Sequence, residues 1–393
     1  MFQFRDFWRL GLGALVLSLA GLAATAEAQV TASMQAISGF GTAGWLAPAS
    51  SSGYLTIDNN QRGMTYNAVT GEVLVAFRQS VSSVSNSIAR FNGTTGGFIG
   101  VTSNSGVTGG DFVINGVDVT TDGVIYAANM ALGSNPFKVY RWEDAAATPT
   151  TAFSNTINTA PIAGITRLGD AFAVFGTGAT TQFAAGGATT TNTNNFAIGN
   201  GLSGGTFTVA TPYINVTPRS LATNNDYRLG LTYVDANTII GLQGGSTRLT
   251  DFDGTTATVA ASSTASLGGT VNYRIIDYIN VAGTPIVAGL NVSSSRVDIF
   301  NFTNPLSPVS LANLNLTTAP ASNGNGTGAI SWGDLVDNGN GTFTAALYAM
   351  STNQGIQAFQ VTMVPEPTTW ALLGTVGIGT GGAMLRRRWK RRV

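Results

Sequence analysis

The chain has 393 residues, with 50 glycines, no cysteine, no histidine and equal numbers of basic and acidic residues. This composition excludes a disulfide framework, a thiol nucleophile, imidazole metal ligands and the Ser-His-Asp arrangement. Eight of the 19 basic but only three of the 19 acidic residues lie within 1–28 and 365–393, so the body at 29–364 is acidic, with 11 basic and 16 acidic residues. An acidic body argues against a nucleic-acid partner.

Residues 1–28 are predicted to be a secretory signal peptide. Arg5 and Arg9 precede an apolar run at 10–24, and Ala26 and Ala28 supply the small residues of a cleavage site. The run is too short for a typical membrane span, which disfavours a first transmembrane helix. We therefore expect the secretion machinery and a signal peptidase to process the chain.

Between residues 29 and 364 the pattern predicts an all-β domain. Short runs of Val, Ile, Phe, Tyr and Thr alternate with Gly, Asn, Asp and Ser, and no persuasive helical periodicity interrupts them. Hairpins are predicted at 66–76, 89–99 and 251–257, where Thr-Gly, Asn-Gly or Asp-Gly pairs tolerate the positive φ angles of tight turns.

The hairpins recur at intervals of roughly 50 to 65 residues, slightly above the usual periods of propeller repeats. The expected strands lie at 73–75, 124–127, 171–175, 238–242, 285–288 and 343–347. We expect a β-propeller of six or seven blades, with residues 45–57 contributing to a seventh blade or closing the ring. A pair of β-sandwiches and a right-handed β-helix are the alternatives.

Residues 177–218 depart from this pattern. The stretch 185–195 is rich in Ala, Gly, Thr and Asn, with too little apolar surface to order itself. It is predicted to be a long loop within the third or fourth blade, and long loops often carry binding functions.

Chemical motifs in the body are scarce, and neither catalytic nor metal-binding residues are assigned. Residues 337–342 (Asp-Asn-Gly-Asn-Gly-Thr) place oxygen ligands at alternate positions, as a calcium loop does, but a plain hairpin turn is favoured. Asp251 with Asp253, or Asp334 with Asp337, would be a carboxylate pair for glycoside hydrolysis. Acidic residues in loops are usually solvated, so no cofactor or catalytic role is predicted for them.

The last 29 residues, 365–393, read as a sorting signal. A short polar motif, Val364-Pro365-Glu366-Pro367, precedes an uncharged segment of roughly membrane-spanning length. The apolar members of that segment are Trp370, Leu372, Leu373, Val376, Ile378 and Leu385. A basic cytoplasmic stop follows, made of Arg386, Arg387, Arg388, Lys390, Arg391 and Arg392. Five glycines lower the hydrophobicity and the helix propensity of this segment, which makes it a poor permanent anchor. An ordinary single-span anchor is the alternative interpretation.

This tail resembles the PEP-CTERM sorting domain of Gram-negative bacteria. Pro365, Glu366 and Pro367 match the signature tripeptide of that family, and the span and the basic end follow in the same order. The resemblance covers the tail only. It implies recognition by an exosortase, a transient stay in the inner membrane, and export to the cell surface or to an exopolysaccharide matrix. It says nothing about what the body does.

Two classes of function therefore stay open for the body. The first is a non-enzymatic binding or structural module of the cell surface or biofilm matrix. The second is a secreted polysaccharide hydrolase or lyase that uses carboxylates in the propeller channel. Two carboxylates converging with an aromatic residue in a central pocket would favour the enzyme, whereas a channel of apolar and Thr side chains would favour the module. A passive coat or spacer is a third reading.

Overall fold

The computed structural model describes part of the chain in detail. The described residues are 30–50, 53–188, 195–213, 227–243, 246–252, 257–262, 267, 273–317 and 322–365. Ala32–Met363 forms one compact unit. Ala26, Ala28, Glu366, Pro367, the apolar span and the basic stop lie outside the described residues. Val364 and Pro365 are the last two residues of the final strand, β25 (Ile356–Pro365).

The described residues form β-strands and one short 3-10 turn, η2 (Gly178–Thr180), so the prediction of an all-β domain at 29–364 is confirmed over its described part. Most strands fall into antiparallel sets of four consecutive members. Set 1 is β3 (Gln61–Asn67), β4 (Glu72–Phe77), β5 (Ser87–Asn92) and β6 (Phe98–Val101); set 2 is β7 (Phe112–Val119), β8 (Ile125–Leu132), β9 (Pro136–Trp142) and β10 (Thr150–Thr156). Set 3 is β11 (Arg167–Phe175), β12 (Gln182–Ala188), β13 (Asn195–Ser203) and β14 (Thr206–Tyr213); set 4 is β15 (Gly230–Asp235), β16 (Thr238–Gln243), β17 (Ser246–Phe252) and β18 (Ala257–Ser262). Set 5 is β19 (Tyr273–Val281), β20 (Thr284–Asn291), β21 (Arg296–Asn301) and β22 (Val309–Asn315); set 6 is β23 (Gly328–Asp337), β24 (Phe343–Ser351), β25 and, from the other end of the chain, β1 (Val30–Ala36).

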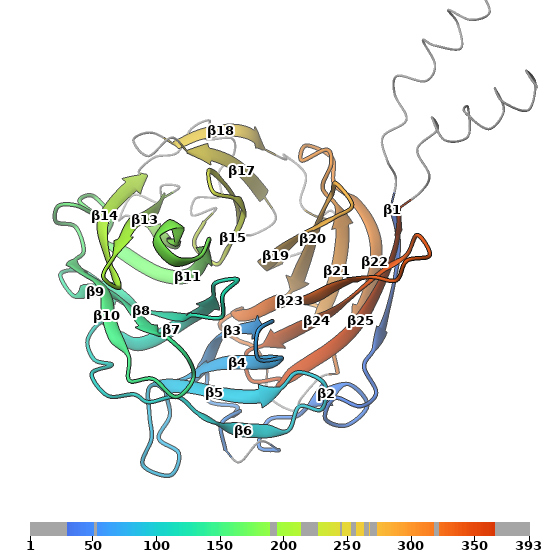
Figure 1. Ribbon diagram of the computed structural model, residues 1–393, viewed down its shortest axis with the longest axis horizontal. Coiled ribbons are helices and arrows are strands. Elements are labelled where there is room, and N and C mark those ends of the chain that lie inside the picture. The colour runs from blue at the N-terminus through green and yellow to red at the C-terminus, as the bar shows by residue number, and fades with distance from the viewer. Residues whose placement is uncertain are drawn as a thin grey trace, which may run out of the picture. The chain divides into compact units, whose positions relative to one another are not determined.

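The first strands of the sets follow one another in a closed cycle. β3 contacts β7, β7 contacts β11, and the contacts continue through β15, β19 and β23 back to β3. Figure 1 shows these strands nearest the centre of the unit, with the last strands of the sets toward its outside. Sets 2 and 3 are also joined directly, because β8 pairs with β11 at Leu132 and Arg167.

Each of the predicted strand segments overlaps an observed strand. Five of them lie in the second strand of a set, whereas 171–175 lies in β11, the first strand of set 3. The hairpin predicted at 66–76 is present, with Asn67 opposite Glu72 and Gly71 at a φ of 68°. The hairpin at 89–99 is present too, with Phe91 opposite Phe98.

The N-terminal segment completes set 6, in part as predicted. β2 (Trp45–Leu46) pairs with β25, and the Trp45 indole donates to the backbone oxygen of Gln354 at 2.8 Å. The principal added strand is β1, which the sequence analysis did not predict. β1 joins the start of the body to its last strand and covers the edge that β25 would otherwise expose.

Burial within a set falls from the middle strands to the last one. Every residue of β4 is buried, whereas every residue of β22 is exposed or half-buried. The middle strands pack against neighbouring sets on both faces, which explains their nearly continuous apolar runs. The last strand faces solvent, so its apolar residues are fewer and its register harder to recognise.

The prediction of a long loop at 185–195 was wrong over most of its described part. Residues 185–188 belong to β12, Asn195 begins β13, and residues 189–194 lie outside the described residues. Small residues are needed here because neighbours approach closely. A Cβ atom on Gly199 of β13 would lie 1.9 Å from Cε1 of Phe183, its partner across the ladder.

Replacing Gly199 by alanine is therefore expected to destabilise the fold by about 3 kcal/mol. The Phe183 ring packs against Phe137, Phe153 and Phe207, so it has little room to give way. Chemical unfolding followed by fluorescence would measure the change. Gly100→Ala is the matched control, because its Cβ would meet no atom within 4 Å. Equal stability of the two variants would contradict the packing described for β12 and β13.

Candidate functional site

A small cavity lies between the first strands of the sets. Its wall takes residues from β3, β7, β11, β15, β19 and β23, and its volume is about 90 Å³. Three carboxylates, those of Asp118, Asp170 and Asp277, line it together with Phe172 and several threonine and aliphatic side chains. Carboxylates that converge with an aromatic residue were expected for an enzyme, and a lining of Thr and apolar side chains was expected for a binding module. This cavity has both features.

Asp118, in β7, links three neighbouring sets. Its Oδ1 accepts hydrogen bonds from the Thr65 hydroxyl of β3 at 2.9 Å and from the Val119 backbone N–H at 2.9 Å. Its Oδ2 accepts from the Val174 backbone N–H of β11 at 2.7 Å. One carboxylate therefore ties set 1, set 2 and set 3 together at their inner strands.

Asp277, in β19, repeats this arrangement in the other half of the unit. It accepts from the Thr232 hydroxyl of β15 at 3.0 Å, from the Tyr278 N–H at 2.8 Å and from the Trp332 N–H of β23 at 2.8 Å. The partners have the same chemical types and positions as those of Asp118. The two aspartates hold sets 1–3 and sets 4–6, respectively, in equivalent ways.

Both carboxylates have raised pKa values. Each borders the cavity on one side but is otherwise surrounded by protein, and this desolvation raises the pKa of Asp118 to about 6 and that of Asp277 to about 7. The hydrogen bonds that they accept act in the opposite direction. The charge of Asp118 adds to the rise at Asp277, so the two carboxylates influence each other across the cavity.

A sequence signal for this pair exists, although the sequence analysis missed it. Gly63-Met64-Thr65-Tyr66 in β3 and Gly230-Leu231-Thr232-Tyr233 in β15 share the pattern Gly-x-Thr-Tyr, with the hydroxyl donor at the same place. Each lies one set before an Asp-bearing first strand. The shared tetrapeptide marks an internal repeat of three sets, which a search for hairpin turns does not detect.

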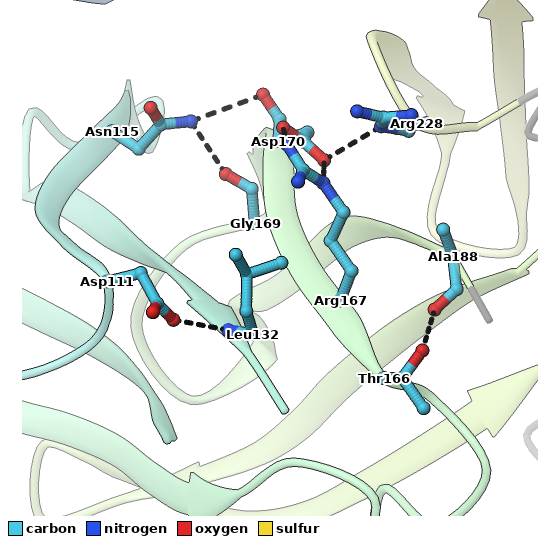
Figure 2. Close-up of polar contacts among 9 residues, drawn as sticks. All are labelled: Asp111, Asn115, Leu132, Thr166, Arg167, Gly169, Asp170, Ala188 and Arg228. Atoms are coloured by element: carbon cyan, nitrogen blue, oxygen red, sulfur yellow. Dashed lines mark hydrogen bonds and ion pairs between the residues drawn. The ribbon is translucent and has the colours of Figure 1, made fainter. Parts of the chain in front are cut away.

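Asp170 of β11 forms a different cluster at one end of the cavity (Figure 2). Its carboxylate accepts from both Nε and Nη2 of Arg167 and from Nε of Arg228, the last at 3.1 Å. The Asn115 amide donates to the Gly169 carbonyl beside it at 2.8 Å. The Asp170 carboxylate is nearly inaccessible to solvent and doubly paired, so it holds β11 and the start of set 4 together.

The carboxylate pairs suggested by the sequence are not part of the cavity wall. Asp251 is exposed and accepts from the Thr238 hydroxyl at 2.9 Å, and Asp253 lies outside the described residues. Asp334 accepts from the Tyr66 hydroxyl at 2.9 Å, and Asp337 accepts from the Gly339 N–H in the turn after β23. Asp251, Asp334 and Asp337 thus each accept a hydrogen bond outside the cavity.

Residues 337–342 form the connection between β23 and β24. Asn338 N–H donates to the Thr342 carbonyl at 3.0 Å, and the Asn340 side chain accepts from Thr342 N–H at 3.1 Å. Within the described ranges, no three acidic side chains gather closely enough to hold a metal ion. The hairpin turn favoured by the sequence analysis accounts for this segment.

Neither Val364 nor Pro365 takes part in the cavity, and the other predicted sorting residues lie outside the described residues. Among the described residues there is no helix with the length and apolar character required to span a bilayer.

No protein-family model and no curated protein matches this chain. Similar solved structures include a DUF4623 family protein from Bacteroides eggerthii, with a TM-score of 0.57, 15% identity, and coverage of 79% of this chain and 71% of that one. The major allergen Mala s 1 of Malassezia sympodialis is similar with a TM-score of 0.50, 11% identity, and coverage of 79% and 94%. At these identities, the similarity concerns the fold alone.

Proposed function

We propose that the chain is an exported protein with a six-bladed β-propeller body and a PEP-CTERM tail, and that the body is a non-enzymatic binding or structural module. Each set of four antiparallel strands would be one blade, with β1 completing the last blade. The cyclic contacts of the first strands support this reading, because radial repetition brings the inner strands of all blades together.

The proposal for the body depends chiefly on the hydrogen bonds of Asp118 and Asp277. Each accepts from three donors on its own and the two adjacent first strands, so each is fully used in joining blades. The cavity beside them, at about 90 Å³, is well below the roughly 300 Å³ at which pockets begin to hold small ligands. Carboxylates in this position join the inner strands at the centre of the ring, beside a cavity smaller than those that enclose small ligands.

The hydrolase or lyase remains the second candidate because of one observation. Two carboxylates face one cavity, as the catalytic pair of a glycosidase does, and both have the raised pKa that the general acid of such a pair has. Release of reducing ends from the host's exopolysaccharide separates the two functions. We expect none from the wild-type protein. Release that disappears in folded Asp118→Asn and Asp277→Asn variants would establish the enzyme instead.

For the tail, we propose that an exosortase recognises Val364 to Pro367 after export and that cleavage releases the body from the inner membrane. The apolar span would then be a transient anchor and the basic residues its cytoplasmic stop. The final destination would be the cell surface or the exopolysaccharide matrix. The tail sequence supports this proposal, which is independent of the geometry of the body.

Replacing Glu366 by alanine is expected to leave the full tail attached and the protein in the inner membrane. The motif would lose the one charge that distinguishes it from the neighbouring polar residues. Intact mass of the protein from inner-membrane and extracellular fractions measures the outcome. The wild-type species should start at Gln29 and end near Val364, and Thr369→Ala, just beyond the motif, should behave in the same way. Normal release of the Glu366→Ala variant would refute the sorting role.

A further inference from the structure

A larger cavity opens beside the central one, between set 1 and set 2. Its volume is about 350 Å³, and its wall includes Arg62 of β3, Arg78 just after β4, and Phe112 of β7. Arg62 also lines the central cavity, so it lies where the two spaces meet. This volume lies within the range of pockets that bind small molecules or single units of a polymer, about 300 to 1,000 Å³.

The two arginines have no acidic partner in the part of the chain that the structure describes. No carboxylate of the described residues lies within 4.0 Å of either guanidinium, whereas Arg90 and Arg141 are paired with Glu72 and Glu143. Nε of Arg62 and Nη1 of Arg78 are buried without an acceptor. The positive charge at this site is therefore not compensated by a contacting carboxylate.

Desolvation lowers the pKa of both arginines. The pKa of Arg78 falls to about 10, first because of burial and then because of the neighbouring Arg62 charge. The pKa of Arg62 is lowered by burial and by Arg167, although Asp170 opposes this. An anion bound between the two guanidinium groups would relieve their mutual repulsion.

Neither acidic residue of the cavity wall forms an ion pair with the two arginines among the described residues. Asp111 accepts from the Leu132 N–H at 2.6 Å and from the Asn135 amide at 3.0 Å, and the first of these contacts appears in Figure 2. Asp58, the other carboxylate of the wall, is exposed.

The arginines are also held in position. Phe112 is 37% exposed, with Cζ of Arg78 4.3 Å and Cζ of Arg62 5.6 Å from the centre of its ring. Nη2 of Arg78 donates to the Asn59 carbonyl at 2.6 Å. Asn59 is fixed in turn by Asn353, whose side chain accepts from the Asn59 N–H at 2.8 Å. A site that is rigid before binding loses less entropy when a ligand arrives.

We infer that Arg62, Arg78 and Phe112 bind a hexuronate unit of an acidic polysaccharide, with its carboxylate against the two guanidinium groups. Planar guanidinium groups match the two oxygens of a carboxylate, and an exposed aromatic ring offers an apolar surface to the sugar. This inference names a ligand class for the binding module and therefore rests on the proposed function of the body.

Binding of a short oligogalacturonate to the full-length chain in neutral detergent, measured by calorimetry, tests the inference. Arg78→Gln is expected to weaken binding at least tenfold, and Arg78→Lys less, because it keeps the charge but loses the planar donor pair. Arg141→Gln is the matched control, since Arg141 also lies over an aromatic ring, Tyr126, but has Glu143 as its partner. Its affinity should stay within twofold of wild type. If Arg78→Gln does not fold, Arg62→Gln should give the same tenfold loss.

Comparison ligands separate the sources of binding. Neutral dextran and inorganic phosphate should bind at least tenfold more weakly than oligogalacturonate, and added salt should weaken the uronate affinity. Equal binding of dextran sulfate or neutral dextran, or unchanged affinity in folded Arg78→Gln, would overturn the inference. These measurements use purified protein, so failed tail processing in the Glu366→Ala experiment leaves them unaffected. Correct processing without uronate binding would remove the inference alone.

Discussion

Asp277→Ala is expected to lower the free energy of unfolding by about 3 kcal/mol. The substitution leaves the Trp332 and Tyr278 N–H groups and the Thr232 hydroxyl without their acceptor, and each unsatisfied buried donor costs about 1 to 3 kcal/mol. Water in the adjoining cavity would satisfy some of these donors, which keeps the total near the lower end. Denaturant unfolding at pH 5, where the Asp277 carboxyl is mostly protonated, measures the loss with little contribution from its charge.

Two control variants show whether the loss of stability comes from the hydrogen bonds of Asp277 or from the removal of any carboxylate. Asp251→Ala removes an exposed carboxylate with a single bond to Thr238, and its effect should stay within about 0.5 kcal/mol. Thr232→Val removes only one of the three donors, so it should cost about 1 kcal/mol. If Asp277→Ala were as stable as Asp251→Ala, Asp277 would not connect the first strands of sets 4, 5 and 6 energetically.

The strand content of the body was predictable because turn chemistry is local. Gly71 has the positive φ that its hairpin requires, and Asn92 accepts from the Thr94 and Thr95 N–H groups in the next turn. Such residues mark strand ends without knowledge of distant neighbours. The assignment of strands to positions within a set was less secure, because first and second strands have similar apolar patterns. This explains why 171–175 was found in β11.

The errors arose where distant contacts decide the structure. The segment from Ala185 has weak intrinsic strand propensity, yet cross-strand packing against Phe183 and its aromatic neighbours orders β12 and β13. The central aspartates were missed for a related reason. Asp118 and Thr65 are separated by 53 positions, and an acidic residue in a strand is usually solvated. Only the repeated Gly-x-Thr-Tyr pattern carried a signal for the pair.

The same aspartates explain how an acidic body is both held together and functionally limited. A body without disulfides is stabilised in part by polar contacts between its inner strands, and Asp118 and Asp277 supply such contacts from two of the sets. The unpaired charge at the arginines lies in the cavity beside this centre, between sets 1 and 2, where more space is available. The proposed ligand site and the contacts that join the inner strands thus use different residues, so mutation can separate their effects.

The contribution of Asp118 and Asp277 to the free energy of unfolding is expected to fall as the pH rises from about 4 to about 8. Their folded-state pKa values, about 6 and about 7, lie above the ordinary value of 3.8, so the folded chain binds more protons than the unfolded chain across this interval. Stability then decreases with pH, and the penalty is complete only above the folded-state values. At about 1.4 kcal/mol per pH unit, the upper limits are about 3 kcal/mol for Asp118 and about 4 kcal/mol for Asp277.

Hydration from the cavity reduces these limits, so we expect a combined loss of about 3 kcal/mol. Paired carboxylates such as Asp170 contribute with the opposite sign, and the Asp118→Asn/Asp277→Asn double variant isolates the central pair. The variant lacks the titrating groups, and at each site an NH2 group replaces one of the two side-chain oxygens that accept hydrogen bonds, so it should be less stable than wild type at pH 4.5. That difference should shrink or reverse by pH 8. A constant difference between the two proteins across this range would mean that neither carboxylate changes its charge in the folded protein.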